Sequence, residues 1–226
     1  MRRLARLFSR RKHDDGPEAA AGGAVCPTKA LTRFLASLAN RPQPLLLDLG
    51  PPVGSNVTFF GERLGCKILV EDLAADVDRH VQDGKVDSLP AFLQTRLQHA
   101  PDSVDGILCW DVFDYLEKPA AQVLAAQLTR ILKPGGALLA FFNTAQPQPG
   151  ARPSHTRHVI VDEGRLEYRP YPAARARQRP LLNRDIQRMF EPLRITDQFL
   201  LQTNTREVLF RKPADRAPAP LPGAAA

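Results

Sequence analysis

The 226-residue sequence has few cysteines and no long apolar run, and both scarcities restrict what the protein can be. Cys26, Cys66 and Cys109 are odd in number, lie far apart and form no C-x-x-C pair. This pattern argues against a disulfide framework and a structural zinc site, and it fits a reducing, cytoplasmic location. No stretch approaches the roughly 20 apolar residues that a helix needs to cross a bilayer, so we expect no transmembrane segment.

Beyond the first twelve residues, the chain has almost no excess of positive charge. The net charge is +7, and residues 2–12 carry six positive charges and no acid, which leaves +1 for the remainder. This arm is a candidate for weak contact with nucleic acid or another anionic surface, or it is simply solvated. We predict a disordered basic arm and linker over residues 1–27, one folded domain over residues 28–212, and a disordered proline-rich tail over residues 213–226. No apolar segment follows the charges, so a secretory signal is not predicted.

Within the predicted domain, short apolar segments alternate with segments of helical periodicity. The apolar segments predict buried strands at residues 45–49, 67–70, 105–110 and 137–142. Helical spacing predicts helices at residues 28–39, 54–64, 74–100 and 117–132. A weak additional strand near Val86 is a further candidate. Short apolar strands joined by helices are typical of a parallel sheet that is covered on both faces.

The last segments depart from this alternation. Residues 182–190 predict a helix, and residues 193–202 and 207–211 predict two strands. Too few residues separate these strands for a helical crossover, so we expect them to form an antiparallel hairpin. The predicted fold is therefore an α/β fold with a doubly wound, mostly parallel sheet that ends in an antiparallel hairpin.

Four motifs, in this order, resemble those of the class I S-adenosylmethionine (SAM)-dependent methyltransferases with a type 11/12-like domain. The first is the strand and turn at residues 46–54, and the second is the acid after the next strand, Glu71, with Asp72 beside it. Residues 104–116 are similar to the fourth-strand motif, and residues 132–136, Leu-Lys-Pro-Gly-Gly, resemble the turn before the fifth strand. The resemblance implies a Rossmann-like sheet of seven strands and SAM as the cofactor.

Three acids lie at or just past the carboxyl ends of predicted strands: Asp48, Glu71 and Asp111. In an open parallel sheet such ends line one crevice, which is where ligands bind. An acid before the turn favours a cation over a pyrophosphate, and SAM carries a sulfonium and an ammonium but no phosphate. The sequence also lacks G-x-G-x-x-G, so a NAD-dependent oxidoreductase is a distant alternative.

The resemblance implies a SAM site made of seven residues: Asp48, Gly50, Gly54, Glu71, Asp72, Trp110 and Asp111. In that site Asp48 would act on the methionine ammonium, and Glu71 would accept hydrogen bonds from the ribose hydroxyls. Trp110 and Asp111 would lie near the methionine end of the cofactor. The alternatives are that the acids after the second strand are solvated and that Trp110 packs in the core. No catalytic residue is assigned.

Pro52 departs from the family pattern, because a glycine is common at its position. Glycine lets the backbone approach a ligand closely, whereas proline fixes φ and removes the N–H. Either the turn is adapted to SAM, or binding is weakened or lost.

The first hypothesis for the function is a SAM-dependent methyltransferase with an unidentified acceptor. The alternative is a methyltransferase-fold protein without catalysis that acts as a SAM-binding or interaction module.

Residues 143–180 are predicted to be an insertion on the cofactor side of the sheet. Within them, residues 158–168 alternate around a turn and predict a β-hairpin, and four arginines follow among prolines. The insertion is a candidate lid with a cationic mouth for an anionic acceptor, or else an exposed arginine loop. His155 and His158 lack a third ligand at a suitable spacing, so no metal site is predicted.

Overall fold

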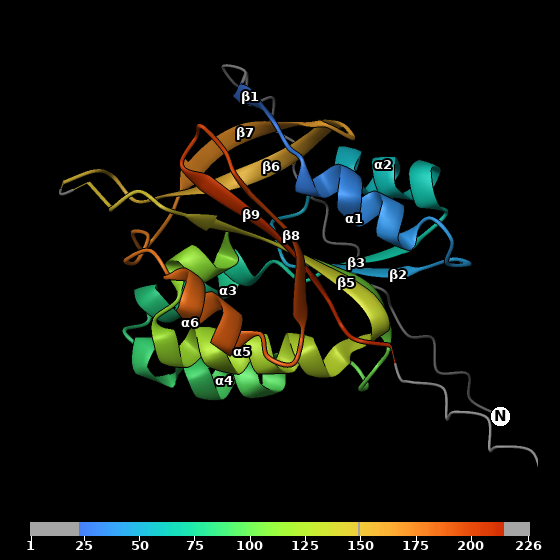
Figure 1. The fold of residues 1–226 in the computed structure, drawn as a ribbon. Helices are drawn as coiled ribbons and strands as arrows, with labels where there is room; N and C mark the ends of the chain where they lie inside the picture. Colours follow the sequence, from blue (N-terminus) through green and yellow to red (C-terminus); the bar gives the residue numbers. More distant parts are fainter. Residues whose placement is uncertain (1–22, 149, 215–226) are drawn as a thin grey trace, which may run out of the picture.

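A computed structural model describes residues 23–148 and 150–214 (Figure 1). Two expectations lie outside the described residues, namely the contacts of the basic arm at residues 2–12 and most of the tail. The described chain forms a central sheet with helices on both faces and a smaller sheet above one end (Figure 1). None of the described helices is long and apolar enough to cross a membrane.

The central sheet has six strands in the spatial order β3-β2-β4-β5-β9-β8. Neighbours from β3 to β5 are parallel, whereas β9 pairs antiparallel with both β5 and β8. The predicted α/β fold and its terminal hairpin are therefore confirmed. The strands are β2 (Leu45–Asp48), β3 (Lys67–Val70), β4 (Val104–Trp110), β5 (Leu132–Asn143), β8 (Arg194–Leu200) and β9 (Thr205–Arg211).

The expected seventh strand is absent from the central sheet of the described residues. The segment near Val86 forms a single 3₁₀ turn, η1 (Val86–Ser88), and not the weak strand proposed from the sequence. Val86 is the only apolar residue between Gly84 and Ser88, so this segment has no apolar run with which to form a buried strand.

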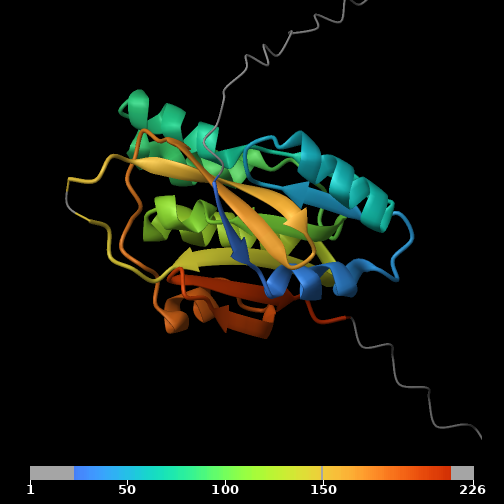
Figure 2. The ribbon, with the colours of Figure 1, turned by 90° about the horizontal axis from the view of Figure 1, so that it is seen from above.

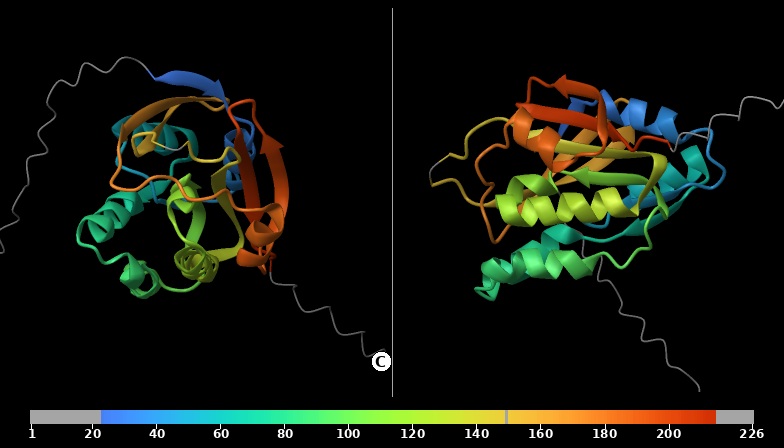
Figure 3. Two further views of the ribbon diagram at one scale, coloured as in Figure 1. Left: turned by 90° about the vertical axis from the view of Figure 1, so that its left-hand side faces the viewer. Right: turned by 60° about the horizontal axis from the view of Figure 1, so that its bottom comes forward.

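The helices cover the two faces of the sheet unequally (Figure 1). One face carries the first two helices, which pack on residues of β2, β4, β5 and β9. The other face carries four helices, and the two further views of Figure 3 show the green helices there on the side away from the small sheet. The first two are α1 (Ala30–Leu38) and α2 (Gly54–Leu64), and the four are α3 (Leu73–Gln82), α4 (Leu89–Arg96), α5 (Lys118–Ile131) and α6 (Asn183–Met189).

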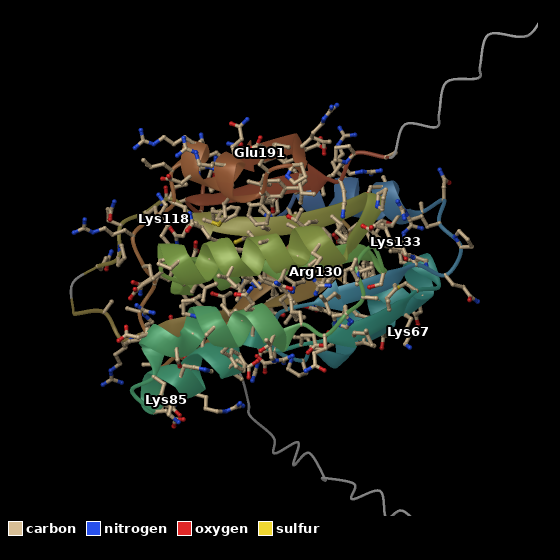
Figure 4. The ribbon with its side chains drawn as sticks, turned by 90° about the horizontal axis from the view of Figure 1, so that it is seen from below. Lys67, Lys85, Lys118, Arg130, Lys133 and Glu191 are labelled. Carbon is tan, nitrogen blue, oxygen red and sulfur yellow. The ribbon has the colours of Figure 1, made fainter. Side chains whose placement is uncertain are left out.

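The outer surface of the four-helix face carries dispersed charge. Figure 4 shows Lys67, Lys85, Lys118 and Lys133 around its periphery, apart from one another. These labelled cations do not form one basic groove. These labelled lysines therefore do not gather into the basic stripe that is typical of a nucleic-acid interface.

The small sheet has the order β1-β7-β6 and lies across the carboxyl ends of the parallel strands (Figure 2). Its hairpin, β6 (Ser154–Asp162) and β7 (Arg165–Pro172), confirms the predicted hairpin and extends it at both ends. The third strand, β1 (Ala24–Pro27), corrects the prediction that the linker continues to residue 27. Backbone pairing at the edge of β7 orders these residues, and the sequence of so short a segment does not reveal that partner.

Gly106 of β4 is the tightest point in the packing of α1 on the sheet. A Cβ built there would lie 2.6 Å from Leu46, 2.8 Å from Leu38 and 2.9 Å from Phe34, all through side-chain atoms. We expect Gly106→Ala to lower the free energy of unfolding by about 1–3 kcal/mol, because a packed core resists added volume. Urea denaturation measures the change.

Gly61 in α2 provides the matched control. Apart from its chain neighbours and the backbone of its own helix, no heavy atom lies within 4 Å of a Cβ built at this position. Gly61→Ala should raise the free energy of unfolding by about 0.5–1 kcal/mol through helix propensity. Similar effects of the two substitutions would contradict the packing described for β4.

Candidate functional site

The carboxyl ends of β2 and β4 bring Asp48 and Trp110 together. Asp48 is the last residue of β2, and its Oδ1 accepts hydrogen bonds from the Gly50 backbone N–H at 2.9 Å and from Trp110 Nε1 at 2.7 Å. Burial raises the pKa of Asp48 to about 6, and the two hydrogen bonds oppose that rise. The acid implied to act on a cofactor ammonium is therefore already bound to groups of the chain itself.

The Trp110 side chain fills the space next to the glycine turn. Its backbone has φ 47°, an uncommon value for a residue with a side chain. A Cβ built on Gly50 would lie 2.7 Å from Trp110 Cδ1, which shows how closely the indole covers the turn. On its other side the indole stacks on His158 of β6, with ring centroids 5.1 Å apart and planes 4° from parallel. Trp110 therefore lies between the turn and the hairpin, and it is 3% exposed.

Glu71 and Asp72 follow β3, and both carboxylates have partners. Glu71 Oε2 accepts from Arg96 Nη1 at 2.6 Å, and its Oε1 lies 3.2 Å from His99 Nε2. Asp72 caps α3 by accepting a hydrogen bond from the Ala75 N–H at 3.2 Å. The ribose role expected of Glu71 stays a prediction, and it would compete with the bond to Arg96.

Asp111 follows β4 and binds the segment after the hairpin. Its Oδ2 accepts from Arg177 Nη2 at 3.1 Å. The same nitrogen donates to Thr156 Oγ1 at 3.2 Å, while Arg177 Nε donates to Tyr115 Oη at 3.2 Å. One arginine thus connects the end of β4, the hairpin and η2 (Val112–Tyr115).

The hairpin is fastened to the sheet by further polar contacts that sequence reasoning missed. Asn56 Nδ2 donates to the His158 carbonyl, and the Ile160 N–H donates to Asn56 Oδ1, both at 2.8 Å. His155 Nε2 lies 2.9 Å from Asp78 Oδ1 on α3. Asn56 lies two residues past the end of the first motif, and this position was the only signal that the sequence offered. The described residues contain no group of His, Cys, Asp and Glu that could hold a metal ion.

The crevice at these strand ends does not fit SAM as it is arranged. Its cavity has a volume of about 20 Å³ and is lined by Gly50, Trp110, Asp111 and residues of the hairpin. A single water needs about 10–15 Å³, and small-molecule sites usually measure about 300–1,000 Å³. Trp110 occupies the place beside Gly50, and His158 covers Trp110. Of the residues predicted for the cofactor site, Asp48 and Gly50 contact the Trp110 indole, whereas Glu71 and Asp72 bind Arg96 and the start of α3.

A larger cavity of about 200 Å³ lies beside the filled crevice, between the ends of β4 and β5 and the hairpin. Asp114 lines it, and both of its carboxylate oxygens accept from the Asn143 N–H at 3.0 and 3.1 Å. Burial raises the pKa of Asp114 to about 8, and the charge of Asp111 adds to the rise. Asp114 was not singled out from the sequence, although it falls within the fourth-strand motif.

The order of strands, the helices on both faces and the terminal antiparallel hairpin define an α/β protein of the class I methyltransferase architecture. Residues 47–140 match the family model described as a methyltransferase domain. The match covers less than half of the chain, and it identifies this segment as similar to a methyltransferase domain. No curated protein matches the sequence significantly.

Three solved structures illustrate the similarity at low sequence identity. The CcbJ methyltransferase from Streptomyces caelestis is 14% identical, with 80% of this chain and 93% of that chain covered and a TM-score of 0.47. The 1,6-didemethyltoxoflavin-N1-methyltransferase from Burkholderia thailandensis is also 14% identical, over 81% and 78%, with a TM-score of 0.46. The [4+2]-cyclase SpnF is 13% identical, over 82% and 81%, with a TM-score of 0.48.

The raised pKa of Asp114 predicts a pH-dependent loss of stability. Between about pH 4 and pH 8 the unfolded chain releases this proton while the folded chain keeps it, so stability falls as pH rises and levels off above about pH 8. Asp114→Asn removes this effect. Its free energy of unfolding should match wild type near pH 4 and exceed it near pH 8 by on the order of a few kcal/mol.

Urea denaturation at a series of pH values measures this difference. The control is Asp87→Asn, which makes the same substitution at an exposed side chain. The control should follow the wild-type profile. A constant difference between Asp114→Asn and wild type at all pH values would show that Asp114 does not hold its proton in the folded state.

Proposed function

We propose that this chain is a methyltransferase-fold protein that acts as a binding module and does not use the family's SAM crevice. The observation that carries the proposal is the Trp110 indole, which hydrogen-bonds Asp48 and packs on Gly50 where the cofactor's methionine end is implied. The chain keeps the motif residues, but it uses them to hold its own side chain.

The free energy needed to move Trp110 out of the crevice favours this proposal over catalysis. An aromatic side chain buries about 150–250 Å² at roughly 25 cal/mol per Å², so exposing Trp110 costs about 4 kcal/mol or more. That penalty would weaken an intrinsic micromolar affinity for SAM about a thousandfold, to the millimolar range. Breaking the Asp48 bond and the stack on His158 would add to the cost.

The second candidate is a SAM-dependent methyltransferase that acts on an unidentified acceptor. The family match over residues 47–140 favours it, as do the retained Asp48, Gly50 and Gly54. It requires Trp110 to leave the crevice, and His158 must separate from the indole because the two rings are stacked. The hairpin would then be a lid that opens for the cofactor.

Calorimetric titration with S-adenosylhomocysteine distinguishes the two candidates. We expect no binding heat from wild type up to about 100 μM ligand, well below the millimolar dissociation constant expected of the closed crevice. Trp110→Gly removes the indole, tolerates the positive φ and should create measurable binding if the indole is the obstacle. Trp110→Phe is the matched control. It keeps an aromatic ring in the crevice and should give no binding heat.

Pro52→Gly tests the turn separately from the indole. If proline rather than Trp110 blocks the crevice, this variant gains binding while Trp110→Gly does not. A wild-type dissociation constant in the low micromolar range would refute the proposal and establish the crevice as a cofactor site. Circular dichroism of each variant checks that the fold is retained.

A further inference from the structure

The cavity of about 200 Å³ beneath the hairpin is large enough for a small molecule. A dry protein cavity of about 150 Å³ holds benzene, so this one matches a single ring with a short substituent. Its walls include Asp111, Asp114, Phe141, His158, Tyr168 and Arg177. Aromatic side chains and carboxyl groups therefore line one partly open cavity.

Two side chains of the cavity have polar atoms without partners among the described residues. His158 is 5% exposed, and its Nδ1 forms no hydrogen bond, since Asp111 Oδ1 lies 4.0 Å away. Burial lowers the pKa of His158, so the ring is neutral and can accept a hydrogen bond. Tyr168 Oη is likewise buried and unpartnered. Buried polar atoms without partners are rare, and a bound ligand is one way to satisfy them.

The charges of the cavity leave one carboxyl group without a contacting cation. Arg177 uses its Nε and Nη2 for Tyr115, Thr156 and Asp111. Its positive charge is therefore matched by Asp111. Asp114 receives only the Asn143 N–H, and Arg206, the other nearby cation, makes its hydrogen bond to the Leu181 carbonyl. A cation entering the cavity would stabilise Asp114 in its ionised form.

The aromatic walls favour the same kind of ligand. The rings of Phe141 and Tyr168 both lie edge-to-face with His158, at centroid distances of 5.3 and 5.1 Å. Aromatic faces attract ammonium groups, most strongly where water is excluded. Carboxylates, a neutral imidazole and a tyrosine oxygen supply hydrogen-bond acceptors for the N–H groups of such a ligand.

We propose that this cavity binds a small organic amine in its ammonium form, held between Asp114, Asp111 and the aromatic side chains of the hairpin. The inference rests on the proposed role as a binding module and names the class of ligand. It does not depend on the crevice filled by Trp110. A failure of one proposal therefore leaves the other open to its own test.

Titration of the full chain with three probes of equal size tests the charge requirement. Benzylamine, benzyl alcohol and benzoate share a ring and differ in charge. We expect benzylamine to bind about tenfold or more tightly than benzyl alcohol, and benzoate to bind most weakly. Equal affinity for the amine and the alcohol, or tighter binding of benzoate, would overturn the proposal. So would the absence of heat from benzylamine, methylammonium and choline alike.

Asp114→Asn locates the site and keeps the shape of the side chain. It should weaken benzylamine about ten- to a hundredfold and leave benzyl alcohol unchanged, because only the charge-assisted contact is lost. Asp87→Asn is the control and should bind like wild type. At pH 7 the wild type should also release about one proton on binding benzylamine, seen as a dependence of the heat on the buffer. An unchanged affinity in Asp114→Asn places the amine elsewhere and refutes the assignment.

These results separate this inference from the proposed function. Wild type that binds S-adenosylhomocysteine and benzylamine would refute the closed crevice and retain the amine site. Wild type that binds neither would retain the closed crevice and refute the amine site.

Discussion

The hydrogen bond from the Trp110 indole to Asp48 is the contact on which the arrangement at the carboxyl end of the parallel strands depends. Both partners lie at the carboxyl ends of adjacent parallel strands, and the indole fills the space between them and the hairpin. The stack of His158 on Trp110 and the two hydrogen bonds of Asn56 then fix β6 above the crevice. The same contacts that fill the crevice therefore also fix the position of the small sheet.

The position of the hairpin over the crevice also places it beside the neighbouring cavity. Because β6 is fixed close to the crevice, the same face of the hairpin also covers the neighbouring cavity, which His158, Tyr168 and Asp114 line. A buried carboxyl near another acid is unfavourable for folding in its ionised form, which is why the pKa of Asp114 rises. Ionisable groups with strongly shifted pKa values are found more often at binding and catalytic sites than elsewhere in proteins.

The overall fold could be predicted because its signals are local. Short apolar segments such as residues 45–49 mark buried strands, and the brief gap between the last two strands requires an antiparallel pair. The site was less predictable, because the partners of its residues are distant in sequence. Arg96 is 25 residues from Glu71, and Arg177 is 66 residues from Asp111. No spacing rule gives those contacts, and the positive φ that aims Trp110 at Asp48 has no signature in its sequence neighbours.

The glycine turn shows why a motif alone does not distinguish an enzyme from a binding protein. In a cofactor site, Gly50 lets the backbone approach a ligand; here its missing Cβ makes room for an indole. Asp48, implied to meet an ammonium, instead satisfies the Gly50 N–H and the Trp110 N–H in a buried place. The same residues are therefore needed under either function, and their presence in the sequence fits both equally well. What separates the two is the occupant of the crevice, and that is decided by the side chain at position 110 and by the strand that packs on it.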